Sequence, residues 1–149
     1  MYKNYVRMFF ISLLLLSQCA YSQVDHYENA LQAYNTQDFN TAYIHIKNAL
    51  KQKPSNLSAK LLLAKVLIKK DQYLLAEQKL KDTLTQGTDI NLIITPLGKS
   101  LLLQSKFDQA LALFINKKLS TQGELSLALI KAEAYQGLDE TEKAQNTYH

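Results

Sequence analysis

Apolar residues recur along this chain at the three- and four-residue spacing of helices, in segments separated by short polar breaks. The two clearest segments are 61–68 and 73–84, and the first of them is almost wholly apolar. Asp71 and Gln72 lie between the two segments. The pattern therefore predicts two helices joined by a tight turn in the middle of the chain.

Three sets of positions, which we call columns, repeat along the sequence at one constant interval. Within each column, successive residues are as far apart in sequence as Ala42 and Ala76. A unit of this length holds two helices of about 12 to 14 residues and two short turns. The sequence therefore predicts an all-α protein built from tandem helix hairpins. The columns are an alanine column of Ala42, Ala76, Ala110 and Ala144, an aromatic column of Phe39, Tyr73 and Phe107, and a small-residue column of Ala30, Ala64, Gly98 and Ala132.

The small residues of these columns allow two antiparallel helices to approach closely, because a larger side chain would push the hairpin open. Turn residues fall between the units: Ser55 and Asn56 after Pro54, and Gly87 with Asp89 one unit later, are expected to cap the helices that follow. Pro96 lies in the first helix of the third unit, where we expect it to kink the helix or delay its start.

Taken together, these positions resemble the tetratricopeptide repeats, whose units place small, aromatic and proline residues at fixed offsets. The resemblance implies a right-handed α-solenoid of antiparallel helix hairpins with about 3.5 to 4 units, near 23–56, 57–90, 91–124 and an incomplete 125–149. The matching positions are Ala30, Phe39, Ala42, Ala49 and Pro54; Leu63, Ala64, Leu67, Tyr73, Ala76 and Leu80; Leu97, Gly98, Leu101, Phe107, Ala110 and Phe114; and Ala132, Tyr135, Ala144 and Tyr148.

A narrower resemblance concerns residues 43–54, which are similar to the first repeats of the large repeat lipoproteins of bacterial exosortase and exopolysaccharide systems. This resemblance implies a role in exopolysaccharide or surface-protein export. Those proteins contain many repeats, whereas this sequence stops at His149 within the repeat phase and without a polar capping helix. We therefore expect this sequence to be either the N-terminal fragment of a longer repeat protein or a truncated open reading frame.

The segment 1–22 has the features of a signal peptide. Lys3 and Arg7 precede an apolar run over 8–16, which is too short to span a bilayer, and 20–22 supply the small residues of a cleavage site before Gln23. An alternative uses Cys19, the only cysteine, as the lipidated residue of an outer-membrane lipoprotein, although Gln18 departs from that motif. Either alternative predicts an extracytoplasmic protein in the periplasm or cell envelope.

Composition supports an ordinary globular fold, because 47% of the residues are apolar and 20% are charged. Removing Lys3 and Arg7 with the signal leaves 15 basic and 13 acidic residues, a net charge of +2. This small excess gives no indication of a nucleic-acid partner. We expect no catalytic site, cofactor or metal, since His26, His45 and His149 are far apart in sequence and are interpreted as separate surface histidines.

The first helix of each unit is expected to line a groove that binds an extended protein or peptide partner. Lys65 and Lys99 occupy the same column of this groove, which suits an acidic side chain or a C-terminal carboxylate. An alternative is that these lysines only keep the surface soluble. The column reads Leu31, Lys65 and Lys99 without asparagine, so chaperone-tail binding is not expected. The groove residues are Tyr27, Leu31, Tyr34, Leu61, Lys65, Ile68, Lys69, Lys99, Leu102 and Glu133.

The sequence as a whole predicts a non-catalytic scaffold for protein interactions, exported from the cytoplasm. Two alternatives remain open at this point. One is an envelope assembly factor anchored through a lipidated Cys19, and the other is a regulatory repeat segment at the N-terminus of a longer protein.

Overall fold

A computed structural model of the chain describes residues 25–147. The predicted signal peptide over 1–22, with Cys19, lies outside the described residues, as do Tyr148 and His149. The described part contains eight α-helices and no strand. These helices are α2 (His26–Asn35), α3 (Phe39–Gln52), α4 (Leu57–Lys69), α5 (Tyr73–Thr85), α6 (Ile90–Leu102), α7 (Phe107–Leu111), α8 (Thr121–Gly137) and α9 (Thr141–Asn146).

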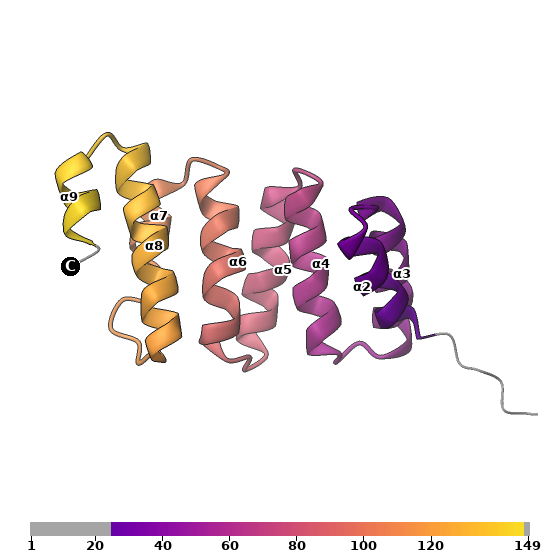
Figure 1. The fold of residues 1–149 in the computed structure, drawn as a ribbon. Helices are drawn as coiled ribbons and strands as arrows, with labels where there is room; N and C mark the ends of the chain where they lie inside the picture. Colours follow the sequence, from indigo (N-terminus) through magenta and orange to yellow (C-terminus); the bar gives the residue numbers. More distant parts are fainter. Residues whose placement is uncertain (1–24, 148–149) are drawn as a thin grey trace, which may run out of the picture.

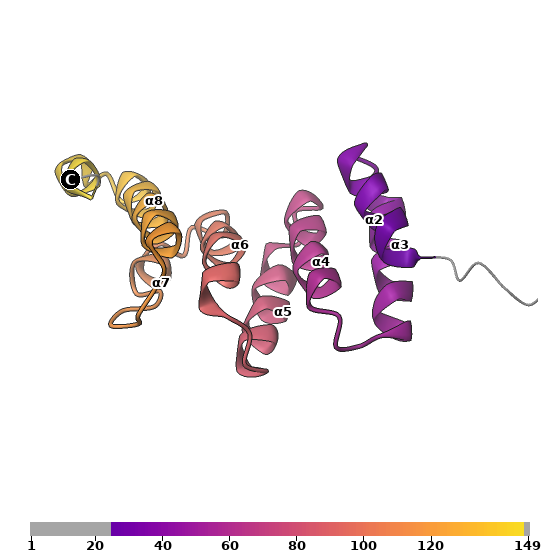
Figure 2. The ribbon, with the colours of Figure 1, turned by 60° about the horizontal axis from the view of Figure 1, so that its bottom comes forward.

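The helices lie side by side in a row, from α2 and α3 at one end to α9 at the other (Figure 1). Each helix packs against the next one in the chain, and further contacts join α2 to α4, α4 to α6 and α6 to α8. Figure 2 shows α4, α6 and α8 on one side of the row and α5 and α7 on the other. Because every contact joins near neighbours, the architecture is an all-helical solenoid, as the sequence predicts.

The turn inside each hairpin recurs with the same period as the columns of the sequence. In each hairpin, the residue two positions before the second helix has a left-handed backbone. The N–H of the next residue donates to the carbonyl of the residue five positions before it, which is the closing bond of a Schellman motif. These turn residues are Gln37, Asp71, Ser105 and Asp139, with φ of 62°, 58°, 55° and 60°. The closing bonds run from Asp38 to Ala33, Gln72 to Leu67, Lys106 to Leu101 and Glu140 to Tyr135.

The alanine and small-residue columns are buried at helix contacts, as predicted. Every alanine in the two columns is at most 2% exposed. Gly98 on α6 is also buried, and a Cβ atom added to it would lie 2.3 Å from Cδ1 of Ile130 on α8. The close packing of α6 and α8 therefore depends on the absence of a side chain at position 98.

Of the four predicted cap residues, Asn56 and Asp89 are the N-caps, and Ser55 and Gly87 are not. The side chain of Asn56 accepts a hydrogen bond from the backbone N–H of Ala59 at the start of α4, and Asp89 does the same for Asn91 at the start of α6. The expected delay at Pro96 was wrong, since α6 begins at Ile90, six residues earlier. Pro96 lies inside this helix and lacks the backbone donor whose acceptor would be the carbonyl of Leu92 in the first turn.

The second helix of the third hairpin departs from the expected length. Only Phe107–Leu111 is helical in α7, because Phe114 and Asn116 have left-handed φ angles of 52° and 59° that a continuing α-helix cannot contain. The next helix begins early, at Thr121, so the unit boundary expected near 124 falls inside α8. Asn91 fixes this start, since its Oδ1 accepts hydrogen bonds from both N and Oγ of the N-cap residue Ser120, each at 2.9 Å.

Helix α4 contributes to both clusters of buried apolar side chains and so joins the first hairpin to the later ones. Leu62, Leu63, Val66 and Leu67 pack into the first cluster, and Ala64 packs into the second. Lys65 and Lys69 of α4 are exposed to solvent. No helix within residues 25–147 has the length and apolar character needed to cross a membrane.

Candidate functional site

Five of the predicted groove residues line one shallow pocket of about 260 Å³. We name this feature the Lys65 pocket. It lies across the first helices of three consecutive hairpins, α2, α4 and α6, which pack against one another in that order. Its lining residues are Tyr34, Lys65, Ile68, Lys69, Asp71, Lys99 and Leu103.

The floor and wall of the Lys65 pocket are apolar and well supported. Ile68 is only 8% exposed, because its side chain belongs to the first core cluster. Tyr34 is half-buried and packs against Phe39 at the start of α3, with ring centroids 5.7 Å apart and the planes tilted by 60°. An aromatic ring fixed in this way offers contact area to a ligand at a low cost in side-chain entropy.

The rim of the pocket carries an excess of positive charge. Lys65, Lys69 and Lys99 are all exposed, and none of them lies within 4.0 Å of a carboxylate in the part of the chain that the structure describes. The one acidic residue of the lining, Asp71, accepts a hydrogen bond from the hydroxyl of Tyr73, which raises the pKa of Tyr73. Three ammonium groups therefore face the pocket, and its only carboxylate already has a partner.

The other predicted groove residues lie outside this pocket. Tyr27 and Leu31 are half-buried against the first core cluster, and Leu61 and Leu102 pack in the same way against the second. Glu133 is exposed on α8. These five side chains share the face expected from the repeat phase, but four of them serve mainly to cover the core.

Two residues of the Lys65 pocket were missed in the sequence. Leu103 lies one full repeat after Lys69, so extending that column would have found it. Asp71 belongs to the hairpin turn, and its left-handed backbone turns its side chain toward the pocket. No periodic signal marks Asp71, because the equivalent residues in the other hairpins are Gln37, Ser105 and Asp139.

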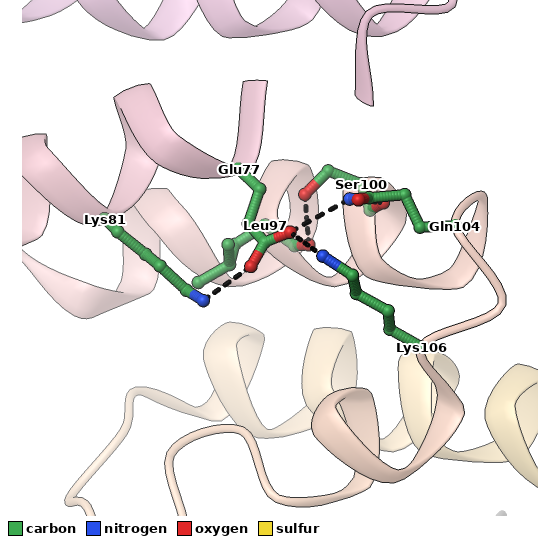
Figure 3. A network of polar contacts seen from close by, with 6 residues as sticks. All are labelled: Glu77, Lys81, Leu97, Ser100, Gln104 and Lys106. Carbon is green, nitrogen blue, oxygen red and sulfur yellow. Dashed lines mark hydrogen bonds and ion pairs between the residues drawn. The ribbon is translucent and has the colours of Figure 1, made fainter. Parts of the chain in front are cut away.

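A second polar arrangement, centred on Glu77, was also missed. The side chain of Glu77 on α5 is buried, with the residue only 4% exposed, and three other groups donate to its carboxylate (Figure 3). The distances are 2.5 Å from Lys81, 2.8 Å from Lys106 and 3.0 Å from Gln104. Gln104 and Lys106 belong to the turn between α6 and α7, so this network joins two consecutive hairpins.

The electrostatics of Glu77 are dominated by these donors. Burial by itself raises the pKa of the carboxyl group, but the hydrogen bonds from Lys106, Lys81 and Gln104 outweigh burial and lower the pKa to about 2. Glu77 is therefore ionised at all ordinary pH values. Because its hydrogen-bonding capacity is largely used by neighbouring side chains, we interpret the network as structural.

The expectation of separate surface histidines was wrong for His26 and His45. Their Nδ1 atoms lie 3.3 Å apart between α2 and α3, and both residues are half-buried. The hairpin brings them together across a sequence distance of 19 residues. Among residues 25–147, no group of three or more histidine, cysteine, aspartate or glutamate side chains is arranged to hold a metal ion.

Comparisons with known proteins identify no family or relative for this chain. A scan against models of known protein families finds no match, and a search of curated proteins finds no similar chain.

Proposed function

We propose that this chain is a non-catalytic scaffold, exported from the cytoplasm, whose Lys65 pocket binds an extended acidic segment of another protein. The observation that carries the proposal is the meeting of Lys65, Lys69 and Lys99 from two successive first helices around the apolar side chains of Tyr34 and Ile68. Ammonium groups without a carboxylate partner attract an acidic side chain or a C-terminal carboxylate, and the apolar floor accepts a neighbouring side chain.

Membership of the tetratricopeptide repeats is part of this proposal. It is supported by the buried small residues and left-handed turn residues that recur once in every unit. The export of the chain rests on the signal-like segment at 1–22, and a role in exopolysaccharide or surface-protein export rests on the narrower resemblance over 43–54.

The test is partner capture with variants that differ in the position of the charge change. Lys65→Glu combined with Lys99→Glu reverses the charge of the pocket, and Lys117→Glu combined with Lys118→Glu makes the same change of net charge on the loop after α7. Proteins captured by the original chain and by the loop variant, but lost from the pocket variant, would support the proposal. Equal capture by all three chains would reject the pocket as the binding site.

A second candidate is an envelope assembly factor held by a lipid on Cys19, which is favoured by the lipobox-like segment 16–19. Mass spectrometry of the mature N-terminus separates the two possibilities. Cleavage before Gln23 leaves no cysteine in the chain, whereas the second candidate requires an acylated Cys19 as the first residue. A regulatory segment of a longer protein would be identified by coding sequence that continues in frame beyond His149.

A further inference from the structure

A second pocket lies between the first two hairpins, away from the Lys65 pocket. It has a volume of about 250 Å³ and is lined by the last turns of α3, the first turns of α4 and the last turns of α5. Leu50 and Leu63 form its apolar floor, and Lys47, Lys60 and Lys79 stand around it. We name this feature the Lys60 pocket.

The two pockets lie on different sides of α4. Lys60 and Lys65 are five residues apart, which places their side chains about 140° apart around a helix of 3.6 residues per turn. The two pockets have no lining residue in common. A ligand in the Lys60 pocket is therefore independent of the one proposed for the Lys65 pocket.

The segment that includes α3 and α4 carries many positive charges. Between Asp38 and Asp71 the sequence contains seven lysines and no acidic residue; Lys47 and Lys60 line the Lys60 pocket, and Lys65 and Lys69 line the Lys65 pocket. The seven are Lys47, Lys51, Lys53, Lys60, Lys65, Lys69 and Lys70. Acidic residues are otherwise frequent in this chain, which has 13 of them, so their absence over α3 and α4 leaves this region with a concentrated positive charge.

The ammonium groups of the pocket are available to a ligand. Lys47 and Lys79 are exposed and form no ion pair with a carboxylate in the described part of the chain, while Lys60 donates to the side-chain oxygen of Gln86. Asp82 is the only acidic residue of the lining. The pocket thus presents three positive charges against one negative charge.

We propose that the Lys60 pocket binds an acidic peptide segment of a partner protein, with an aliphatic side chain on Leu50 and Leu63 and flanking carboxylates on Lys47, Lys60 and Lys79. Its volume is below the roughly 300 to 1,000 Å³ typical of small-molecule sites, and it suits single side chains of a peptide. The lining contains neither an aromatic ring to stack on a base nor an arginine fork for a phosphate, so a peptide carboxylate is the favoured anion. The chain would then hold protein segments on two sides.

The experiment titrates the full chain with a decapeptide of alternating glutamate and leucine, amidated at its C-terminus, and follows backbone amide NMR signals. The signals of Leu50 and Gln86 report binding at the Lys60 pocket, because these residues line it and lie outside α4, the helix that contributes to both pockets. We expect these signals to shift in a saturable way. Lys47→Glu combined with Lys79→Glu should weaken the Kd from these signals about tenfold, because it reverses two rim charges. A peptide of alternating glutamine and leucine should produce no saturable shift.

Two further variants serve as controls with the same change of net charge. Lys117→Glu with Lys118→Glu, and Lys65→Glu with Lys99→Glu, should each change the Kd at the Lys60 pocket by less than about twofold. Equal weakening by all three double variants would overturn the proposal, because it would mean unspecific attraction to a basic protein. Thermal melts of each variant exclude unfolding as the cause of any loss.

Two other outcomes would overturn the proposal of a peptide site in the Lys60 pocket. Saturable shifts confined to the Lys65 pocket would reject the second site while leaving the first intact. Shifts at Leu50 and Gln86 that appear with inorganic phosphate or a single-stranded oligonucleotide, and exceed those of the peptide, would replace the peptide by a phosphate-bearing ligand.

Discussion

The carboxylate of Glu77 on α5 lies 2.8 Å from the ammonium group of Lys106, which is the N-cap residue of α7. This ion pair joins the second hairpin to the third at a position where the acid is almost completely buried. Gln104 donates to the same carboxylate oxygen at 3.0 Å. The relative position of these two hairpins is therefore fixed by polar contacts as well as by apolar packing.

Glu77→Gln is expected to lower the free energy of unfolding by about 2 kcal/mol, because it removes the buried charge that pairs with Lys106 and accepts a hydrogen bond from Gln104. Urea unfolding followed by circular dichroism measures this change. Lys81→Gln is the control, since Lys81 donates to the same carboxylate but its side chain is 53% exposed. Its cost should stay below about 0.5 kcal/mol. Equal costs for the two variants would show that Lys106 and Gln104 do not depend on Glu77.

The stability of the protein should depend on pH through Glu77. Its folded pKa of about 2 lies below the ordinary value of 4.5, so the unfolded chain binds the proton more tightly. The contribution is complete above pH 4.5 and is lost as the pH falls toward 2, by up to about 3 kcal/mol. Between pH 2 and 7, the plot of unfolding free energy against pH should therefore be flatter for Glu77→Gln than for the original chain. Parallel curves would contradict the lowered pKa.

Gly98→Ala should destabilise the protein by about 1 to 2 kcal/mol, because the new Cβ would lie within 3 Å of three side-chain atoms of Ile130. Alanine is otherwise the better helix former, so a loss of stability would arise from crowding. Ile130→Val removes Cδ1, the atom nearest to the new Cβ. The double variant should therefore lose less stability than the sum of the single changes. If the stability losses of the two single variants add up to that of the double variant, the two positions do not interact.

Gln37→Gly should stabilise the protein by about 0.5 to 1 kcal/mol, since Gln37 is exposed and has a left-handed φ of 62° that glycine adopts without steric cost. Gln32→Gly is the matched control inside α2, the helix before this turn, where an exposed interior position should lose about 1 kcal/mol. Melting temperatures of the two variants should move in opposite directions. A decrease for both would mean that the turn tolerates glutamine without strain.

The repeat could be predicted from the sequence because it depends on residue size at fixed positions. Ala42, Ala76 and Ala110 must be small for neighbouring helices to touch, and such a requirement recurs with every unit. Length changes within a unit could not be predicted in the same way. The short α7 depends on the backbone at Phe114 and on the contact between Asn91 and Ser120, which lie 29 residues apart.

The candidate sites show the same division. The repeat phase placed Lys65 and Lys99 in one column, and the structure brings both to one pocket. The repeat phase could not separate the residues that line the pocket from those that cover the core, because both occupy the same face of each helix. Leu61 and Leu102 are residues that cover the core.

By itself, the sequence determined that this protein is a row of helix hairpins with one constant period, since close helix packing selects small residues locally and repeatedly. Only the tertiary structure decided where side chains from different helices meet. The Glu77 network, the pair of His26 and His45 and the two lysine-rimmed pockets each combine residues from two or more helices. Such meetings depend on the angle and distance between packed helices, which no single segment of sequence contains.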